Sequence, residues 1–215
     1  MMAAIALLTP SLALAQMPGT TAGAGPVPWR KMPSVTVVWF ADDERVRIVR
    51  EAVAYWNRLF GEIGTPFRLG PVSYVSGTIP ADQLQAISNQ VLGGARPELP
   101  ANIGQVAGDI IVALSDGEFI SFGMRWPQHA KALVGIKSGR RYPLSLPNVE
   151  RNVAAHELGH AIGFRHNADP TMLMCGRPAP CRPDAFAGPA ERFFPLAEQE
   201  KAVLRAMYPP GWPGR

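Results

Sequence analysis

Three histidines and one glutamate lie close together in a pattern that can bind a metal ion and use it in catalysis. The segment His156-Glu-Leu-Gly-His160 places two histidines four residues apart, with Glu157 directly after the first. Residues four apart share one face of an α-helix, so both imidazoles can bind the same ion. Glu157 leaves the helix at another angle, so it can reach a water at the ion without ligating it. The pattern favours a zinc hydrolase with Glu157 as general base.

A third ligand follows the two helical histidines. Gly163 can end the helix, because glycine tolerates the left-handed conformation that turns the chain, and His166 can then return to the ion. Three protein nitrogens leave a fourth position open, as in catalytic rather than structural zinc sites. The alternative is unrelated histidines on a buried helix. The extended motif argues against it, since it fixes five positions and contains three of the four histidines of the chain.

The elements around this motif predict an α+β fold. Residues 34–40 are β-branched and aromatic, which is typical of a buried strand. Asp42 can cap a helix whose apolar residues recur every three or four positions up to Phe60, and Asn148 can cap the metal-binding helix. We expect a twisted mixed sheet with two long helices behind it and an irregular C-terminal part that closes the cleft. The predicted strands cover residues 34–40, 67–72, 109–114 and 132–137, and the predicted helices residues 42–60, 82–92, 149–163 and 196–208.

The N-terminus predicts export. Residues 1–15 contain a short apolar run and the small-x-small pattern Ala13-Leu-Ala15, which together predict a signal peptide, although no Lys or Arg precedes the run. A buried N-terminal helix is the alternative. Residues 16–33 are rich in Gly, Pro, Thr and Ala, which predicts a flexible lead-in to a single domain over residues 34–215. We expect a secreted or periplasmic protein, and no segment has the roughly 20 apolar residues of a membrane span.

Composition and cysteine content add weaker constraints. The net charge is +4, but the basic residues are scattered and no nucleic-acid motif is present, so we expect no nucleic-acid partner. The two cysteines, Cys175 and Cys181, predict a disulfide in an oxidising compartment. A second metal site or a redox pair is the alternative, although the spacing is not C-x-x-C and no histidine is adjacent.

The motif resembles that of the metzincin zinc endopeptidases. Metzincins have a methionine turn beneath the zinc, and here Met174 follows His166 by eight residues, at the spacing of the matrixin branch; Met172 fits less well. Pattern similarity to a matrixin catalytic domain extends over most of residues 34–208. The absence of a tyrosine soon after the methionine turn disfavours the astacin and serralysin branches.

The resemblance implies a peptidase acting on protein or peptide substrates, as a monomer. It implies that the substrate pairs antiparallel with an edge strand, for which the candidates are Leu133, Val134, Gly135 and Ile136; a buried interior strand is the alternative. The loop that carries a second zinc and calcium in animal matrixins has only His129 here, so we expect one zinc and no such calcium site. Two other functions stay open, a zinc-binding module without activity and a zinc amidase acting on cell-envelope polymers.

Overall fold

A mixed five-stranded sheet forms the centre of the fold. The computed structural model describes residues 26–40, 43–176, 181, 186–189 and 191–214. The strand order is β2-β1-β3-β5-β4, in which the first three pairs are parallel and the β5–β4 pair is antiparallel. This confirms the predicted α+β class. The strands are β1 (Val35–Trp39), β2 (Val72–Ser76), β3 (Ile110–Ser115), β4 (Phe122–Trp126) and β5 (Lys131–Lys137).

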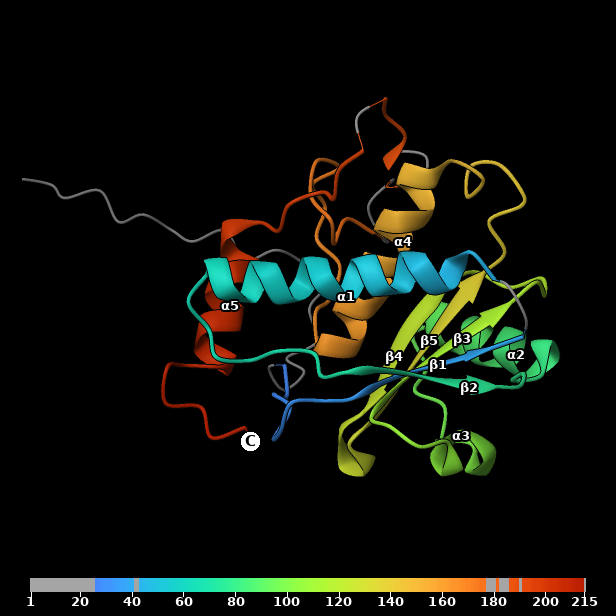
Figure 1. The fold of residues 1–215 in the computed structure, drawn as a ribbon, viewed down its shortest axis with the longest axis horizontal. Coiled ribbons are helices and arrows are strands. Elements are labelled where there is room, and N and C mark those ends of the chain that lie inside the picture. Colours follow the sequence, from blue (N-terminus) through green and yellow to red (C-terminus); the bar gives the residue numbers. More distant parts are fainter. Residues whose placement is uncertain (1–25, 41–42, 177–180, 182–185, 190, 215) are drawn as a thin grey trace, which may run out of the picture.

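Helices cover both faces of the sheet. The two long helices α1 and α4 pack against one face and against each other, as predicted, and Figure 1 shows α1 crossing α4 above the strands. The opposite face is covered by α2 and α3, which form a second, smaller core that the sequence reading did not anticipate. The helices are α1 (Arg45–Glu62), α2 (Ala81–Leu92), α3 (Ala101–Gln105), α4 (Pro147–Ile162) and α5 (Glu198–Met207), with a 3₁₀ turn η1 (Pro127–His129).

The predicted substrate edge strand is wrong. Leu133, Val134 and Ile136 belong to β5, which lies between β3 and β4, and their side chains are 0–1% exposed. A strand that is buried on both faces has a continuous run of apolar residues, which is easy to recognise in the sequence. The edge strand next to it has no comparable pattern that identifies it as the edge. The edge is β4, whose residues alternate: Phe122, Met124 and Trp126 face the α2 side, while the residues between them are half-buried.

The domain begins earlier than residue 34, because part of the predicted flexible lead-in is built into the core. Trp29 is 1% exposed and its indole N–H donates to the carbonyl of Ala161, in the last turn of α4. Its backbone N–H donates to the hydroxyl of Tyr208, and the guanidinium of Arg125 lies 4.0 Å from its ring centre. The predicted signal peptide and residues 16–25 lie outside the described residues.

Replacing Trp29 by alanine is expected to destabilise the fold by about 3–5 kcal/mol, the usual cost of emptying a buried aromatic site. Urea unfolding followed by circular dichroism measures the change. Val27→Ala is the matched control, because that side chain is 49% exposed in the same segment. Equal stability of the two variants would show that residues 26–33 are not part of the folded domain.

Two further elements lie at other positions than the sequence pattern predicted. The strand predicted at residues 67–72 is an irregular segment with Phe67 buried, and β2 follows it at Val72–Ser76. The metal-binding helix begins at Pro147, so Asn148 lies in its first turn instead of capping it. Proline at the first helical position explains the start, because its fixed φ suits a helix and its missing N–H needs no partner there.

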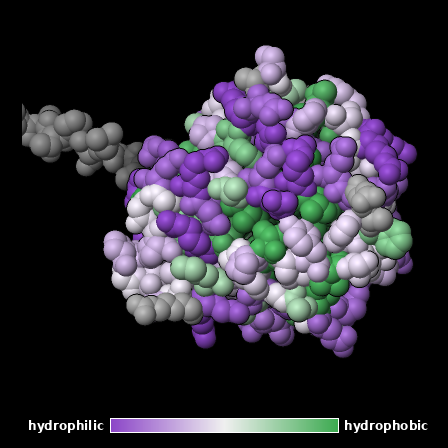
Figure 2. All heavy atoms as spheres, viewed as in Figure 1, coloured by the Kyte–Doolittle hydropathy of each residue, from purple (hydrophilic) through white to green (hydrophobic). Residues whose placement is uncertain are grey.

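The face of the molecule drawn in Figure 2 is mostly polar. In Figure 2, hydrophilic side chains dominate the face seen in Figure 1, with hydrophobic side chains gathered in a few patches between them. Among the helices in the described parts of the chain, none has both the length and the apolar character needed to cross a membrane.

Candidate metal centre

Helix α4 holds the first two histidines at the buried centre of the molecule. Almost all of its residues are buried, as expected for a helix packed between a sheet and a second helix. The indole N–H of Trp56 in α1 donates to the carbonyl of Ala155 and fixes the two helices together next to His156. The helix ends at Gly163, which has φ of 129°, a conformation that side chains other than glycine rarely adopt. The turn there brings His166 back toward α4, as the sequence predicted.

The three histidine rings converge on one point. The Nε2 atom of His160 lies 3.1 Å from that of His156 and 3.0 Å from that of His166, and the remaining pair is separated by 3.2 Å. Within the parts of the chain that the structure describes, this is the one group of three or more His, Cys, Asp or Glu side chains able to hold a metal ion.

Two backbone carbonyls set which nitrogens face the centre. Nδ1 of His156 lies 2.7 Å from the carbonyl oxygen of Leu173, and Nδ1 of His160 lies 2.9 Å from that of Phe164. A carbonyl oxygen only accepts hydrogen bonds, so both Nδ1 atoms carry the proton and each neutral ring directs its Nε2 lone pair inward. Burial lowers the pKa of His156 to about 4 and that of His160 well below its ordinary value, so both rings are neutral at pH 7.

This donor set fits a zinc ion. Nitrogen ligands of a tetrahedral zinc lie about 3.3 Å apart, given a zinc–nitrogen distance of about 2.05 Å, and the observed separations of 3.0–3.2 Å are close to that. Two inward lone pairs at 3.1 Å repel one another unless a cation lies between them. The Nδ1–carbonyl bonds are the outer-shell contacts that usually orient ligating histidines.

Glu157 lies in the wall of the same cleft and not in solvent. Its side chain is 7% exposed and forms part of the cleft lining together with the three histidines. Burial raises the pKa of Glu157 to about 8, and a hydrogen bond from the backbone N–H of Gly123 opposes that rise. A carboxylate that is buried in this way binds a proton more readily than one in water.

Met174 packs beneath the histidines and does not face them. It is fully buried, and a Cβ atom added at Gly159 would lie 2.5 Å from its sulfur, which places the thioether directly against α4 between the two helical histidines. The preceding residue, Leu173, supplies the carbonyl that orients His156. Met172, the other methionine of the turn, is only half-buried.

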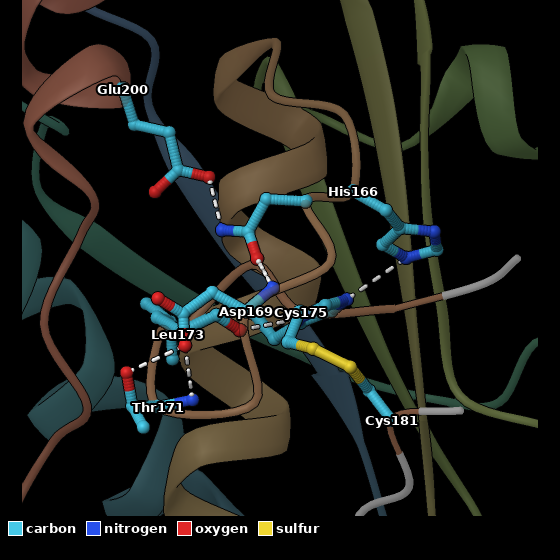
Figure 3. The surroundings of a disulfide bond; sticks show 9 residues. His166, Asp169, Thr171, Leu173, Cys175, Cys181 and Glu200 are labelled. Atoms are coloured by element: carbon cyan, nitrogen blue, oxygen red, sulfur yellow. Dashed lines mark hydrogen bonds between the residues drawn. A yellow bond between two sulfur atoms is a disulfide. The ribbon is translucent and has the colours of Figure 1, made fainter. Parts of the chain in front are cut away.

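The predicted disulfide between Cys175 and Cys181 is present, and both residues line the cleft. Figure 3 shows it beside His166, on the loop that follows the methionine turn. The backbone around Cys175 is bonded to the segment that follows His166. The N–H of Asn167 donates to the carbonyl of Met174, and the N–H of Gly176 donates to the carbonyl of Asn167. The side chain of Asn167 also donates to Glu200 of α5, which ties the third histidine's loop to the C-terminal helix (Figure 3).

Two asparagines of α4 hold the segment around Phe186 and residues 192–194 against the helix. The sequence did not predict this role. The amide of Asn148 donates to the carbonyl of Phe186 and accepts from the N–H of Arg192. Asn152, fully buried, donates to the carbonyl of Arg192 and accepts from the N–H of Phe194. Their spacing of four residues on one helix face was a visible signal, but their partners are irregular backbone some 40 residues away.

The cleft itself has a volume of about 780 Å³ and is mainly apolar. The start of β4 and the loop before it form one wall of the cleft, and α4 lies along it. The other wall includes Cys175, Gly176, Cys181 and Phe186. Of the residues predicted for the site, the histidines, Glu157 and the two cysteines line this space, Met174 lies beneath it, and Leu133 to Ile136 lie outside it in β5.

No protein-family model and no curated protein matches this chain. Among solved structures it is similar to an archaemetzincin from Methanopyrus kandleri, with 14% identity and a TM-score of 0.48 over 83% of this chain and 96% of that one. It is also similar to a zinc-dependent peptidase from Methanocorpusculum labreanum (16%, TM-score 0.40, 79% and 99%) and to myroilysin (11%, TM-score 0.43, 87% of each). At these levels the function has to be inferred from the residues of this chain.

Proposed function

We propose that this chain is a secreted zinc-dependent endopeptidase of the metzincin type, with a matrixin-like methionine turn at Met174. The observation that carries the proposal is the convergence of three Nε2 atoms within 3.0–3.2 Å, with Glu157 in the wall beside them. His156, His160 and His166 would hold the ion and Glu157 would be the general base. Export rests on the predicted signal peptide at residues 1–15 and is consistent with the disulfide.

Zinc held by three histidines supplies Lewis-acid chemistry, which polarises a carbonyl and acidifies a water. The carboxylate of Glu157 removes the proton from the attacking water and passes it to the leaving amine. The backbone N–H of Gly123 faces this carboxylate, and burial raises the pKa of Glu157, which makes it a stronger base. The carbonyls of Leu173 and Phe164 keep two of the rings oriented during the reaction.

An extended peptide fits beside β4. This strand is the edge of the sheet next to the histidines, and pairs within the sheet only with β5. An edge strand offers backbone donors and acceptors to which a substrate can add as a further strand. We therefore propose that the substrate pairs with the backbone of β4, and not with Leu133 to Ile136 as the sequence predicted. Two other functions would use the same site: zinc binding without turnover, and an amidase acting on envelope polymers. The intact Glu157 disfavours the first.

Zinc and activity are expected to depend on the same three residues. The purified full chain should contain one zinc per molecule by elemental analysis and should hydrolyse casein, with inhibition by a hydroxamate, which binds zinc. His156→Ala should lose most of its zinc and its casein hydrolysis, because two ligands hold the ion far more weakly than three. His129→Ala is the matched control, since His129 is exposed in η1 and should keep both.

The same preparation separates the alternatives. Zinc binding with no hydrolysis of casein or purified peptidoglycan would indicate a binding module, and cleavage of peptidoglycan alone would indicate an amidase. Zinc content unaffected by His156→Ala would disprove the proposed metal site.

A further inference from the structure

For a substrate that pairs antiparallel with β4, as the proposed function implies, the position of Gly123 shows where the residues after the cut would lie. This residue of β4 lies level with the catalytic groups, because its N–H bonds to Glu157 and its Cα packs against His160. A strand that pairs antiparallel with β4 runs opposite to it. Substrate residues after the cut would therefore lie along Phe122 and the loop before it, which is the side on which the cleft is lined by Phe119, Ile120 and Ser121.

Two of the basic side chains of the cleft, Lys137 and Arg141, lie at that end. Among the described lining residues, Lys137, Arg141 and Arg165 carry positive charge, while Glu157 is the one carboxylate. Lys137 ends β5, and its backbone N–H donates to the hydroxyl of Ser121. Phe122, the first residue of β4, pairs with Gly135, and extending this register two residues beyond the strand would bring Lys137 level with Ile120, three residues before Gly123.

A carboxylate of the protein itself, that of Glu118, is already paired with Lys137 and Arg141. Glu118 accepts from Nζ of Lys137 at 2.8 Å through one oxygen, and its other oxygen lies 2.8 Å from Nη1 of Arg141. The hydrogen bond from Lys137 and the charge of Arg141 lower the pKa of Glu118. The side chains of Glu118 and Arg141 are 62% and 76% exposed, so little packing holds this arrangement and another carboxylate can replace that of Glu118.

We propose that Lys137 and Arg141 form a subsite for a carboxylate of the substrate. Three residues along a strand span about 10 Å, which places this carboxylate at the second or third residue after the cut. It comes either from an acidic side chain or from the C-terminal end of a short peptide. The inference rests on the proposed peptidase function and adds a substrate class to it: apolar peptides with a negative charge following the scissile bond. A lysine or arginine at the same position is disfavoured by like charge.

Matched peptides test this subsite. One series differs only in Glu, Gln or Lys at the second and third positions after the cut, with an amidated C-terminus; a second series ends at the third position as a free acid or an amide. With the full chain, kcat/KM is expected to be about fivefold higher for Glu than for Gln, and lower still for Lys. Raising the salt concentration should reduce the ratio, because exposed charges are screened.

Three variants identify the residues responsible. Arg141→Ala should bring the Glu-to-Gln ratio close to one, whereas Arg140→Ala, which removes an equally exposed neighbour bound to Asp116, should leave it unchanged. Glu118→Gln should raise the ratio, because it removes the competing carboxylate. A preference seen only in the free-acid series would assign the subsite to the chain end.

Equal cleavage of the Glu and Gln peptides together with equal cleavage of the free-acid and amide peptides, or a ratio that survives Arg141→Ala, would overturn the subsite and leave the peptidase function intact. Failure to cleave any peptide would overturn both.

Discussion

Glu157→Gln is expected to lower kcat/KM for peptide hydrolysis by about a thousandfold, within the range usual for loss of a general base. Glutamine has nearly the same shape and can still accept the hydrogen bond from Gly123, but it cannot take a proton from water. The contacts that orient His156 and His160 are with the backbone carbonyls of Leu173 and Phe164 and not with this side chain, so the variant should keep one zinc per molecule. Peptide kinetics and zinc analysis on the same sample measure both quantities.

Glu150→Gln is the control for this prediction. Glu150 lies on the same helix and burial raises its pKa to about 7, but it faces a different cavity, near the start of α1, and not the histidines. Its loss should change the rate by less than about threefold, as for a substitution outside the machinery. A Glu157→Gln enzyme that retains more than a tenth of the activity would show that another group accepts the proton.

The second large effect is expected from Gly123→Ala. A Cβ atom at this position would lie 2.2 Å from the carbonyl oxygen of Glu157 and 2.7 Å from Cβ of His160. Both contacts are with the helix carrying the catalytic groups, so β4 and α4 have to move apart. We expect a loss of about 2–3 kcal/mol in the free energy of unfolding, and a fall of about a hundredfold in kcat/KM because the base and one ligand are displaced.

Gly104→Ala provides the comparison. This glycine lies in α3, and a Cβ there would meet only a leucine side chain at 3.6 Å, an ordinary contact. Its stability should be unchanged or slightly higher, since alanine favours a helix more than glycine does. Urea unfolding and peptide kinetics of both variants decide the matter; a Gly123→Ala protein as stable and active as the parent would mean that strand and helix are not closely packed.

The metal-binding triad could be predicted because it is almost entirely local. Helical periodicity places His156 and His160 on one face, and the glycine at 163 ends the helix where the chain has to turn. The fold class, the two long helices and the strands at Ile110–Ser115 and Lys131–Lys137 were also predicted close to where they occur, since each has a strong periodic or apolar pattern.

The features that were missed depend on contacts between distant segments. Nothing in the segment 133–136 shows that another strand lies beyond it, because sheet order is decided by tertiary packing. The carbonyls that orient the histidines belong to Leu173 and Phe164. Every residue type has a backbone carbonyl, so the sequence does not show which residues supply these contacts. Trp29 stands among residues typical of a linker, and its partners Ala161 and Tyr208, 132 and 179 positions away, show that it is part of the core.

The support beneath the end of α4 is made by the first and last parts of the described chain together. Trp29 bonds to the Tyr208 hydroxyl through its N–H, and its carbonyl accepts from the indole of Trp212. These partners are 179 and 183 residues away from it. Ala161 and the neighbouring His160 therefore acquire their full support only after these distant segments have come together, so the order of the histidine site depends on the folding of the whole described domain.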